Sequence, residues 1–497
     1  MKKIFSIVLF SALVLGLNGC KDYMDINSDP NSPASENLTS DMILSAAEMN
    51  IAATYSYTLH VLGAYNVEYY AQQFGTPNYV KYSQFEVSAT NGSGIYTQLF
   101  QRALGNLNTV KQRATDNGEN GVLLQVAVLR AFAYQLLVDA FGEVPYKEAF
   151  QPSILTPHYD KGQDIYEGLI KEINDALAAV KAGDAVAKSF IIPSQSLDEW
   201  IRFANGQKLR MLVRMSDVKD VKADVEAIVA ENKLPEGDVK IAGCWANASG
   251  QANPLFSEEL ATWGRATNNM IGNVALIQTM QDGGVDGRLA KLFKKNKTGV
   301  FQGGLSGSNL STVDEPYNSS DAFGGIVVAY NTPVILLGKT EVEFFLAEFF
   351  ARQNDAGQAK AHYDAAIEAS FATAGAEGAA EAIALRPYNH ANWKECIGVS
   401  KWIALAGING FEGYTEARRL DYPEFGNISG TDMYPLGKGA IDFGLYVAGK
   451  LYTPFDVFSK VGNNHLLERF PYPESSTSRN SNAPAFPGHL EPIFWGK

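Results

Sequence analysis

Apolar residues recur every three to four positions through two long parts of this chain, a spacing that gives a helix one apolar face. The first part predicts helices over residues 41–74, 95–114, 121–141, 164–182 and 197–216. The second part predicts helices over residues 340–352, 357–373 and 393–406. In 217–338 and 421–497 the spacing weakens and glycine-rich and polar runs take over, so we expect mostly loops there. Strand-like alternation is rare and short.

Consecutive helices with short connections are typical of paired helices stacked as in tetratricopeptide repeats, although the chain shows no regular repeat of about 34 residues. We therefore predict a mainly α fold of tetratricopeptide-like helix pairs, with a large irregular, loop-rich portion and little sheet. No low-complexity linker follows Ser40. The expected organisation is one body over 41–497, helical in 41–216 and 339–420 and loop-rich in 217–338 and 421–497.

One charged residue interrupts the apolar face of the helix predicted over 121–141. Arg130 shares that face with Ala127, Ala133 and Leu137. A buried guanidinium needs polar partners. Arg130 is therefore either a ligand contact or an internal partner of a carboxylate or of helix-end carbonyls, and we favour the internal role because buried arginines are usually paired.

The N-terminus has the order of an export signal: Lys2 and Lys3, an apolar run from Ile4 to Leu17, and then small or polar residues before Cys20. The apolar run is shorter than the roughly 20 residues of a membrane-spanning helix. Residues 17–20 resemble a bacterial lipoprotein cleavage box, so we expect residues 1–19 to be removed and Cys20 to be acylated. The alternative is a soluble secreted form. Residues 21–40 are rich in Asp, Asn and Pro and predict a flexible tether.

This tether places acidic and amide residues at positions 1, 3, 5, 7 and 12 of a calcium-loop pattern. These residues are Asp25, Asn27, Asp29, Asn31 and Glu36. Pro30 occupies position six, where such a loop needs the sharp turn that glycine allows. We therefore predict no metal site here.

The chain is acidic, with a formal net charge of −13, and removal of Lys2 and Lys3 would make it more negative by two. This charge disfavours binding to nucleic acid or to anionic lipid by electrostatics alone. The two remaining cysteines, Cys244 and Cys396, are too few for a disulfide framework. They are either one bridge or two buried thiols, and the helical spacing of 393–406 favours a core position for Cys396.

Catalytic patterns are missing. The histidines are scattered, no paired cysteines or H-E-x-x-H spacing predicts zinc, and Ser306 lacks the context of a nucleophile elbow. A glycosidase needs two carboxylates at a set distance in the folded protein, and the sequence does not give that distance. With 54 acidic residues in the chain, a catalytic pair therefore stays an open alternative. We expect a binding protein, with no enzymatic activity and no cofactor, and keep a lipid-anchored glycosidase as a rival.

Five stretches together resemble one family, the SusD/RagB-like nutrient-binding outer-membrane lipoproteins. They are D-x-N-x-D-P-N at 25–31, LRAFAYQLLVDAFGEVPYKEA at 129–149, EVEFFLAEFFAR at 341–352, EARRLDYP at 416–423 and RFPYPE at 469–474. The chain departs from the family pattern at Tyr414, where tryptophan is usual, and at Ser476.

The resemblance implies a fold, a location and a partner. It implies tetratricopeptide-like helix pairs, and an outer-membrane lipoprotein that covers the mouth of a TonB-dependent (SusC-like) β-barrel transporter. Lys21 and Asp22 look like a surface-export signal of that bacterial group, which implies the cell-surface side. The implied ligand is a nutrient, an oligosaccharide by preference, with peptides as the alternative. A structural helical-repeat lipoprotein that scaffolds outer-membrane assembly is the rival from another class.

Sugar recognition needs flat aromatic rings and hydrogen-bonding groups. Two irregular segments supply them, and the candidate ligand contacts are Tyr79 and Tyr82 in 75–85, and Trp245, Trp263, Arg265 and Asn268 in 244–269. The alternative for each aromatic residue is that it only packs a loop against the helices.

Overall fold

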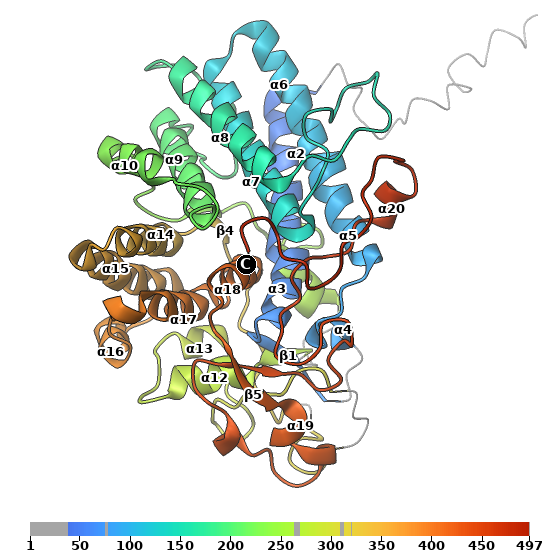
Figure 1. Ribbon diagram of the computed structural model, residues 1–497, viewed down its shortest axis with the longest axis vertical. Helices are drawn as coiled ribbons and strands as arrows, with labels where there is room; N and C mark the ends of the chain where they lie inside the picture. The colour runs from blue at the N-terminus through green and yellow to red at the C-terminus, as the bar shows by residue number, and fades with distance from the viewer. Residues whose placement is uncertain (1–37, 75–77, 263–268, 309–312, 320, 497) are drawn as a thin grey trace, which may run out of the picture.

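The computed structural model describes residues 38–74, 78–262, 269–308, 313–319 and 321–496. Helices dominate this part of the chain (Figure 1). Helices α2, α6, α7 and α8 group at one end, α14 to α17 form a second group, and α3 and α18 lie between them at the centre (Figure 1). The mainly α prediction is confirmed.

The helices of the N-terminal part are α2 (Ser40–Ala53), η2 (Thr54–Leu59), α3 (His60–Asn66), α4 (Val80–Ser83), α5 (Ala89–Tyr96), η3 (Thr97–Leu104), α6 (Gly105–Asn117), α7 (Asn120–Phe141), α8 (Gly162–Ala179), α9 (Leu197–Arg214) and α10 (Lys222–Glu231). The middle part has α11 (Pro254–Phe256), η4 (Ser257–Thr262), α12 (Val274–Gln281) and α13 (Leu289–Leu292). The C-terminal part has α14 (Lys339–Arg352), α15 (Ala356–Ala374), α16 (Ala379–Leu385), η5 (His390–Asn392), α17 (Trp393–Leu405), α18 (Gly410–Leu420), α19 (Gly430–Met433), η6 (Pro435–Gly437), η7 (Phe443–Leu445) and α20 (Glu474–Thr477).

Sheet is confined, in the described residues, to three two-stranded ribbons. Strand β1 (Tyr70–Gln72) pairs antiparallel with β3 (Met270–Gly272), and β2 (Val239–Ile241) pairs antiparallel with β4 (Val334–Leu337). Strand β5 (Phe425–Ser429) pairs parallel with β6 (Leu451–Thr453). The prediction of little sheet is confirmed.

Six of the eight helices expected from the apolar spacing are confirmed within a few residues. The helix expected over 95–114 is longer, because α5, η3 and α6 follow one another from Ala89 to Asn117, and the helix expected over 41–74 is wrong in its last part. The helical run from α2 through the π-helical η2 to α3 ends at Asn66. Glu68 then adopts a left-handed backbone with φ +56°, and Tyr70 pairs with Gly272 in the first ribbon. The apolar spacing did not predict the end of the helix at Asn66, because Tyr69 and Tyr70 are buried and continue the apolar pattern.

The internal role favoured for Arg130 is confirmed. Its Nε lies 3.1 Å from Glu172 Oε2 on α8. The two remaining thiols are free, so Cys244 and Cys396 form no bridge. Both are only half-buried. Cys396 packs at the edge of a core cluster, so the core position expected for it is met in part, and its thiol lies next to the Pro387 carbonyl on an open side of α17.

Helix α7 has the length and hydropathy of a membrane-spanning helix, yet 94% of its most apolar window is buried inside the protein. It packs against α6, α8 and α9 and forms the centre of the helical half. Its hydropathy therefore reflects a core position.

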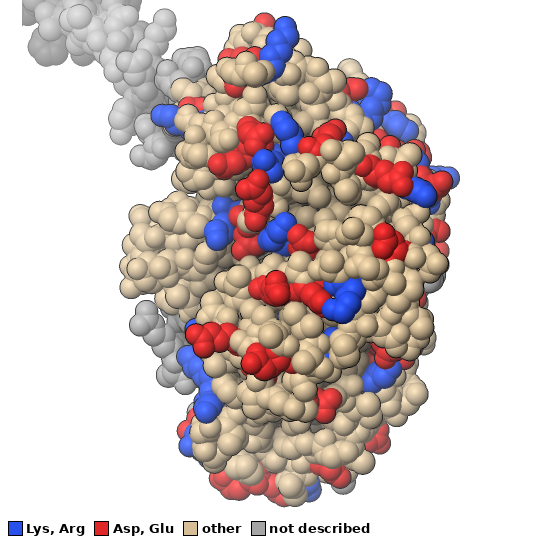
Figure 2. Space-filling view, turned by 90° about the vertical axis from the view of Figure 1, so that its left-hand side faces the viewer, with Lys and Arg blue, Asp and Glu red and all other residues tan. Residues whose placement is uncertain are grey.

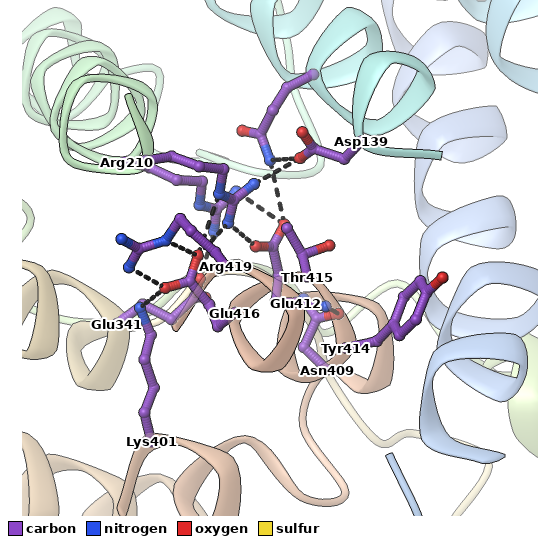
Figure 3. Close-up of polar contacts among 12 residues, drawn as sticks. Asp139, Arg210, Glu341, Lys401, Asn409, Glu412, Tyr414, Thr415, Glu416 and Arg419 are labelled. Carbon is purple, nitrogen blue, oxygen red and sulfur yellow. Dashed lines mark hydrogen bonds and ion pairs between the residues drawn. The ribbon is translucent and has the colours of Figure 1, made fainter. Parts of the chain in front are cut away.

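A network of buried charges joins α7, α9, α14, α17 and α18 (Figure 3). Its members are Asp139, Arg210, Arg214, Glu341, Glu348, Lys401, Glu412, Glu416 and Arg419. Arg210 lies 2.9 Å from Glu341, and Lys401 lies 2.8 Å from Glu416. Although burial alone would raise it, the charges of Arg419, Lys401 and Arg214 hold the pKa of Glu416 well below its ordinary value.

Three of the sequence stretches singled out above supply members of this network: 129–149, 341–352 and 416–423. The stretch 469–474 packs beside it, where the Phe470 N–H donates to the Ala140 carbonyl over 2.8 Å. Removing one partner of a buried ion pair typically costs about 3–5 kcal/mol of stability. These stretches therefore hold the helices together.

Candidate functional site

Two of the predicted contacts, Tyr79 and Tyr82, lie together on and just before the short helix α4. Their ring centroids are 5.9 Å apart and the rings are inclined by 35°. Tyr79 also stacks on Tyr65 of α3 at 5.5 Å and 30°. The three rings therefore form a row, Tyr65–Tyr79–Tyr82, called the tyrosine row below. Tyr65 is buried at its inner end, while Tyr79 and Tyr82 are half-buried.

Tyr79 is held in an uncommon conformation. Its backbone is left-handed, with φ +63°. Such a conformation costs a bulky residue on the order of 1 kcal/mol and is maintained only when surrounding contacts fix it. The stacking on Tyr65 and the contacts of its hydroxyl supply this support, so the ring is presented in a fixed position.

The hydroxyl groups of the row are bonded to polar groups from separate segments. Tyr79 donates to Glu259 Oε2 over 3.3 Å, and the Tyr57 hydroxyl of η2 lies 3.3 Å from the Tyr79 oxygen. Glu259 Oε1 accepts from the Met270 N–H over 3.0 Å. The Tyr82 hydroxyl accepts from the Asn91 amide over 2.7 Å. Residues from η2, α4, α5, η4 and β3 thus meet at the tyrosine row.

Glu259 is the ionisable group of this cluster. Its side chain is buried and forms no ion pair with a cation in the described residues. Burial raises its pKa to about 7, against the opposing effect of the hydrogen bonds from Met270 and Tyr79. Burial also raises the pKa of Tyr79 and of Tyr82, which keeps both phenols neutral.

The inner end of the cluster has hydrogen-bonding capacity to spare. The buried Tyr65 hydroxyl and the buried Asn269 amide nitrogen have no hydrogen-bond partner among the described residues. Half-buried aromatic rings beside unused donors suit a ligand that presents both C–H faces and hydroxyls. The described residues contain no group of His, Cys, Asp and Glu suited to a metal ion.

The structure does not bring all predicted contacts to this place. Trp245 lies on the loop after β2, half-buried against the core, and no ring contact in the described part of the chain joins it to the tyrosine row. Its indole nitrogen has no hydrogen-bond partner there. Trp263, Arg265 and Asn268 lie outside the described residues.

Sequence reasoning missed Tyr57, Tyr65 and Glu259. A signal for the tyrosines existed, because 55–70 is unusually rich in tyrosine for one helix. The sequence analysis placed them in a predicted helix and singled out neither. Tyr65 is buried and Tyr57 is half-buried. Nothing local marks Glu259, since its contact with Tyr79 spans 180 positions.

The surface charge does not form a single patch on the face shown in Figure 2. Acidic and basic side chains are interspersed there, and most of the surface is neither. The negative net charge is therefore spread out on this face, which offers no basic track for a nucleic acid.

Comparison with known proteins gives a consistent result. The SusD-like family described as "Starch-binding associating with outer membrane" matches residues 30–434. No curated protein matches the chain.

Solved structures are similar along nearly the whole chain. A SusD homolog from Bacteroides uniformis ATCC 8492 has a TM-score of 0.72 at 21% identity, covering 92% of this chain and 99% of that one. A chitin-binding SusD homolog from Flavobacterium johnsoniae has a TM-score of 0.70 at 19% identity, covering 92% and 98%. A further chitin-binding protein has a TM-score of 0.71 at 20% identity, covering 89% and 95%. These identities support the shared fold.

Proposed function

Since the chain belongs to the SusD-like family of starch-binding proteins associated with the outer membrane, whose members bind and do not catalyse, we propose that it captures an oligosaccharide at the tyrosine row and delivers it to a TonB-dependent transporter. We infer a glycan as the ligand from the description of the family and from two chitin-binding proteins of the same fold.

The observation that carries the proposal is the tyrosine row itself. A pyranose ring has an apolar C–H face that packs on an aromatic ring, and a rim of hydroxyls that needs donors and acceptors. Tyr79 and Tyr82 offer ring surface, and their hydroxyls are already oriented by Glu259 and Asn91. Orientation before binding lowers the entropy lost on complex formation.

Delivery requires a position at the membrane. We propose that acylated Cys20 anchors the protein on the cell-surface side of the outer membrane, that residues 21–40 serve as a tether, and that residues 41–497 act as one nutrient-binding body above a SusC-like barrel. Several acyl chains give stable anchoring because each buried methylene contributes about 0.8 kcal/mol.

Titration calorimetry with malto-oligosaccharides and chito-oligosaccharides tests the ligand site. Tyr82→Ala removes the outer ring of the row, and a central aromatic contact typically contributes more than about 1 kcal/mol, so affinity for the bound glycan should fall about tenfold. Tyr388→Ala, which truncates another half-buried tyrosine, is the matched control and should leave affinity unchanged. Equal affinities for wild type and Tyr82→Ala would disprove the assignment.

Peptide capture is tested in the same experiment. Tri- and tetrapeptides are titrated alongside the glycans. If peptides bind and no glycan binds, the ligand class is peptide instead of oligosaccharide, and the proposed role as a nutrient receptor is kept.

A further inference from the structure

One cavity lies away from the tyrosine row and has a different chemistry. It has a volume of about 590 Å³, within the range of small-molecule sites. Its wall is built by α13, the ribbon of β2 and β4, the C-terminal half of α15 and the end of α17. Helix α13 lies below α17 in Figure 1, in agreement with this wall. Tyr57, Tyr65, Tyr79 and Tyr82 do not contribute to it.

The cavity wall is aliphatic and contains no aromatic residue within the described ranges. Its apolar members include Leu292, Val327, Pro333, Ile335 and Ile403. A sugar-binding surface needs aromatic faces, so this cavity is poorly suited to a pyranose. It suits instead a ligand with a flexible apolar body.

Two exposed lysines contribute positive charge to the wall. Lys240 of β2 and Lys291 of α13 line the cavity, and neither forms an ion pair with a carboxylate in the part of the chain that the structure describes. Three of the other charged residues of the wall form ion pairs: Arg288 with Asp286, Lys339 with Glu343, and Glu236 with Arg202. Asp238 accepts from two neutral donors, the Lys339 N–H and the Thr373 hydroxyl, so its negative charge offsets one of the two lysines and the wall keeps one excess positive charge.

Lys240 and Lys291 are both exposed, so their ammonium groups are accessible to a ligand at the mouth of the cavity. An ammonium group at the mouth of an aliphatic cavity is complementary to a carboxylate attached to an apolar body. We infer that this cavity is a second binding site, which takes an organic carboxylate with an apolar body, its head group between Lys240 and Lys291 and its body against Leu292, Ile335 and Ile403.

Two sources share this chemistry, namely free aliphatic acids and the C-terminus of an apolar peptide. Ligand-observed NMR on the tagless mature body, with octanoate in one arm and Leu-Val-Leu in the other, distinguishes them. Octanamide and the amidated tripeptide are the neutral counterparts. At least one acid should bind, and its neutral counterpart should bind about tenfold more weakly, since a charge-assisted contact is lost.

Variants locate the site. Lys240→Gln and Lys291→Gln should each weaken binding of the acid about fivefold to tenfold, while Lys181→Gln, an exposed lysine outside the cavity, should not. Ala369→Phe fills part of the cavity and should abolish binding, while Ala361→Phe on the exposed face of α15 should not.

Three results would overturn the inference: no binding of either acid to the wild type at millimolar concentration, equal binding of acid and neutral counterpart, or binding unchanged in both lysine variants and in Ala369→Phe. Glycan affinity measured in the same variants should stay at the wild-type value. This readout separates the cavity from the tyrosine row.

Discussion

At the scale of single residues, the most informative group is Glu259, a buried carboxyl that forms no ion pair within the described residues. Its pKa is raised to about 7 from an ordinary value of 4.5. Below pH 4.5 the carboxyl is protonated in both folded and unfolded states. Between pH 4.5 and 7 the unfolded chain loses this proton first, so the carboxyl lowers stability progressively as the pH rises.

Glu259→Gln removes this ionisation and keeps the shape of the side chain. The variant should gain stability relative to wild type between pH 4.5 and 7.5, by up to roughly 3 kcal/mol. Urea unfolding of wild type and of Glu259→Gln at pH 4.5 and at pH 7.5 measures the difference in the free energy of unfolding. Burial also raises the pKa of Glu48 and of Glu468 to about 7, and these common contributions cancel in the comparison. A stability difference that does not change with pH would contradict the prediction.

At the scale of elements, the contact between α3 and α18 depends on the absence of side chains. A Cβ atom added to Gly63 would lie 2.3 Å from the Gly410 carbonyl oxygen, and one added to Gly410 would lie 2.2 Å from the His60 carbonyl oxygen. Both obstacles are backbone atoms, which cannot move aside as a flexible side chain could. The two helices therefore approach backbone to backbone, and α3 carries Tyr65, the inner ring of the tyrosine row.

Gly63→Ala should separate these helices and destabilise the protein by about 3 kcal/mol, within the range of severe overpacking. Gly94→Ala is the matched control, because Gly94 lies in helix α5 and an added Cβ meets nothing within 4 Å. Gly94→Ala should stabilise α5 by about 0.5–1 kcal/mol. Thermal unfolding of both variants measures these opposite shifts, and equal shifts would refute the packing argument.

At the scale of the whole molecule, the sequence predicted what depends on local periodicity. The helix over 121–141 was predictable because its apolar face repeats at 3.6 residues and its ends are marked by glycine. The end of α3 at Asn66 was not, because it depends on pairing between Tyr70 and Gly272, about two hundred positions apart. Such non-local pairing leaves no trace in a short window of sequence.

The same distinction applies to the site. Tyr79 and Tyr82 were proposed as ligand contacts from their residue type and from their position after a helical run, and their role in binding stays a prediction. Glu259 and Tyr65 were not, because only the folded chain brings η4 and α3 against them. The stretches 129–149, 341–352 and 416–423 resemble the family because they supply the buried charge network of Figure 3, with members such as Asp139 and Glu416. A buried network of this kind stabilises the fold and therefore gives no information about the ligand.

The proposed anchor gives a prediction for the whole protein. The proposed lipid is attached through the thiol of Cys20, so Cys20→Ser should release the protein from the membrane fraction of a bacterium that processes lipoproteins. Cys396→Ser keeps Cys20 and is the matched control, which should remain with the membrane. Intact-mass analysis of the membrane form should show a chain that begins at position 20 and carries acyl chains. Retention of Cys20→Ser in the membrane fraction would show that association with the membrane does not depend on this lipid and would remove the anchor from the proposed delivery mechanism.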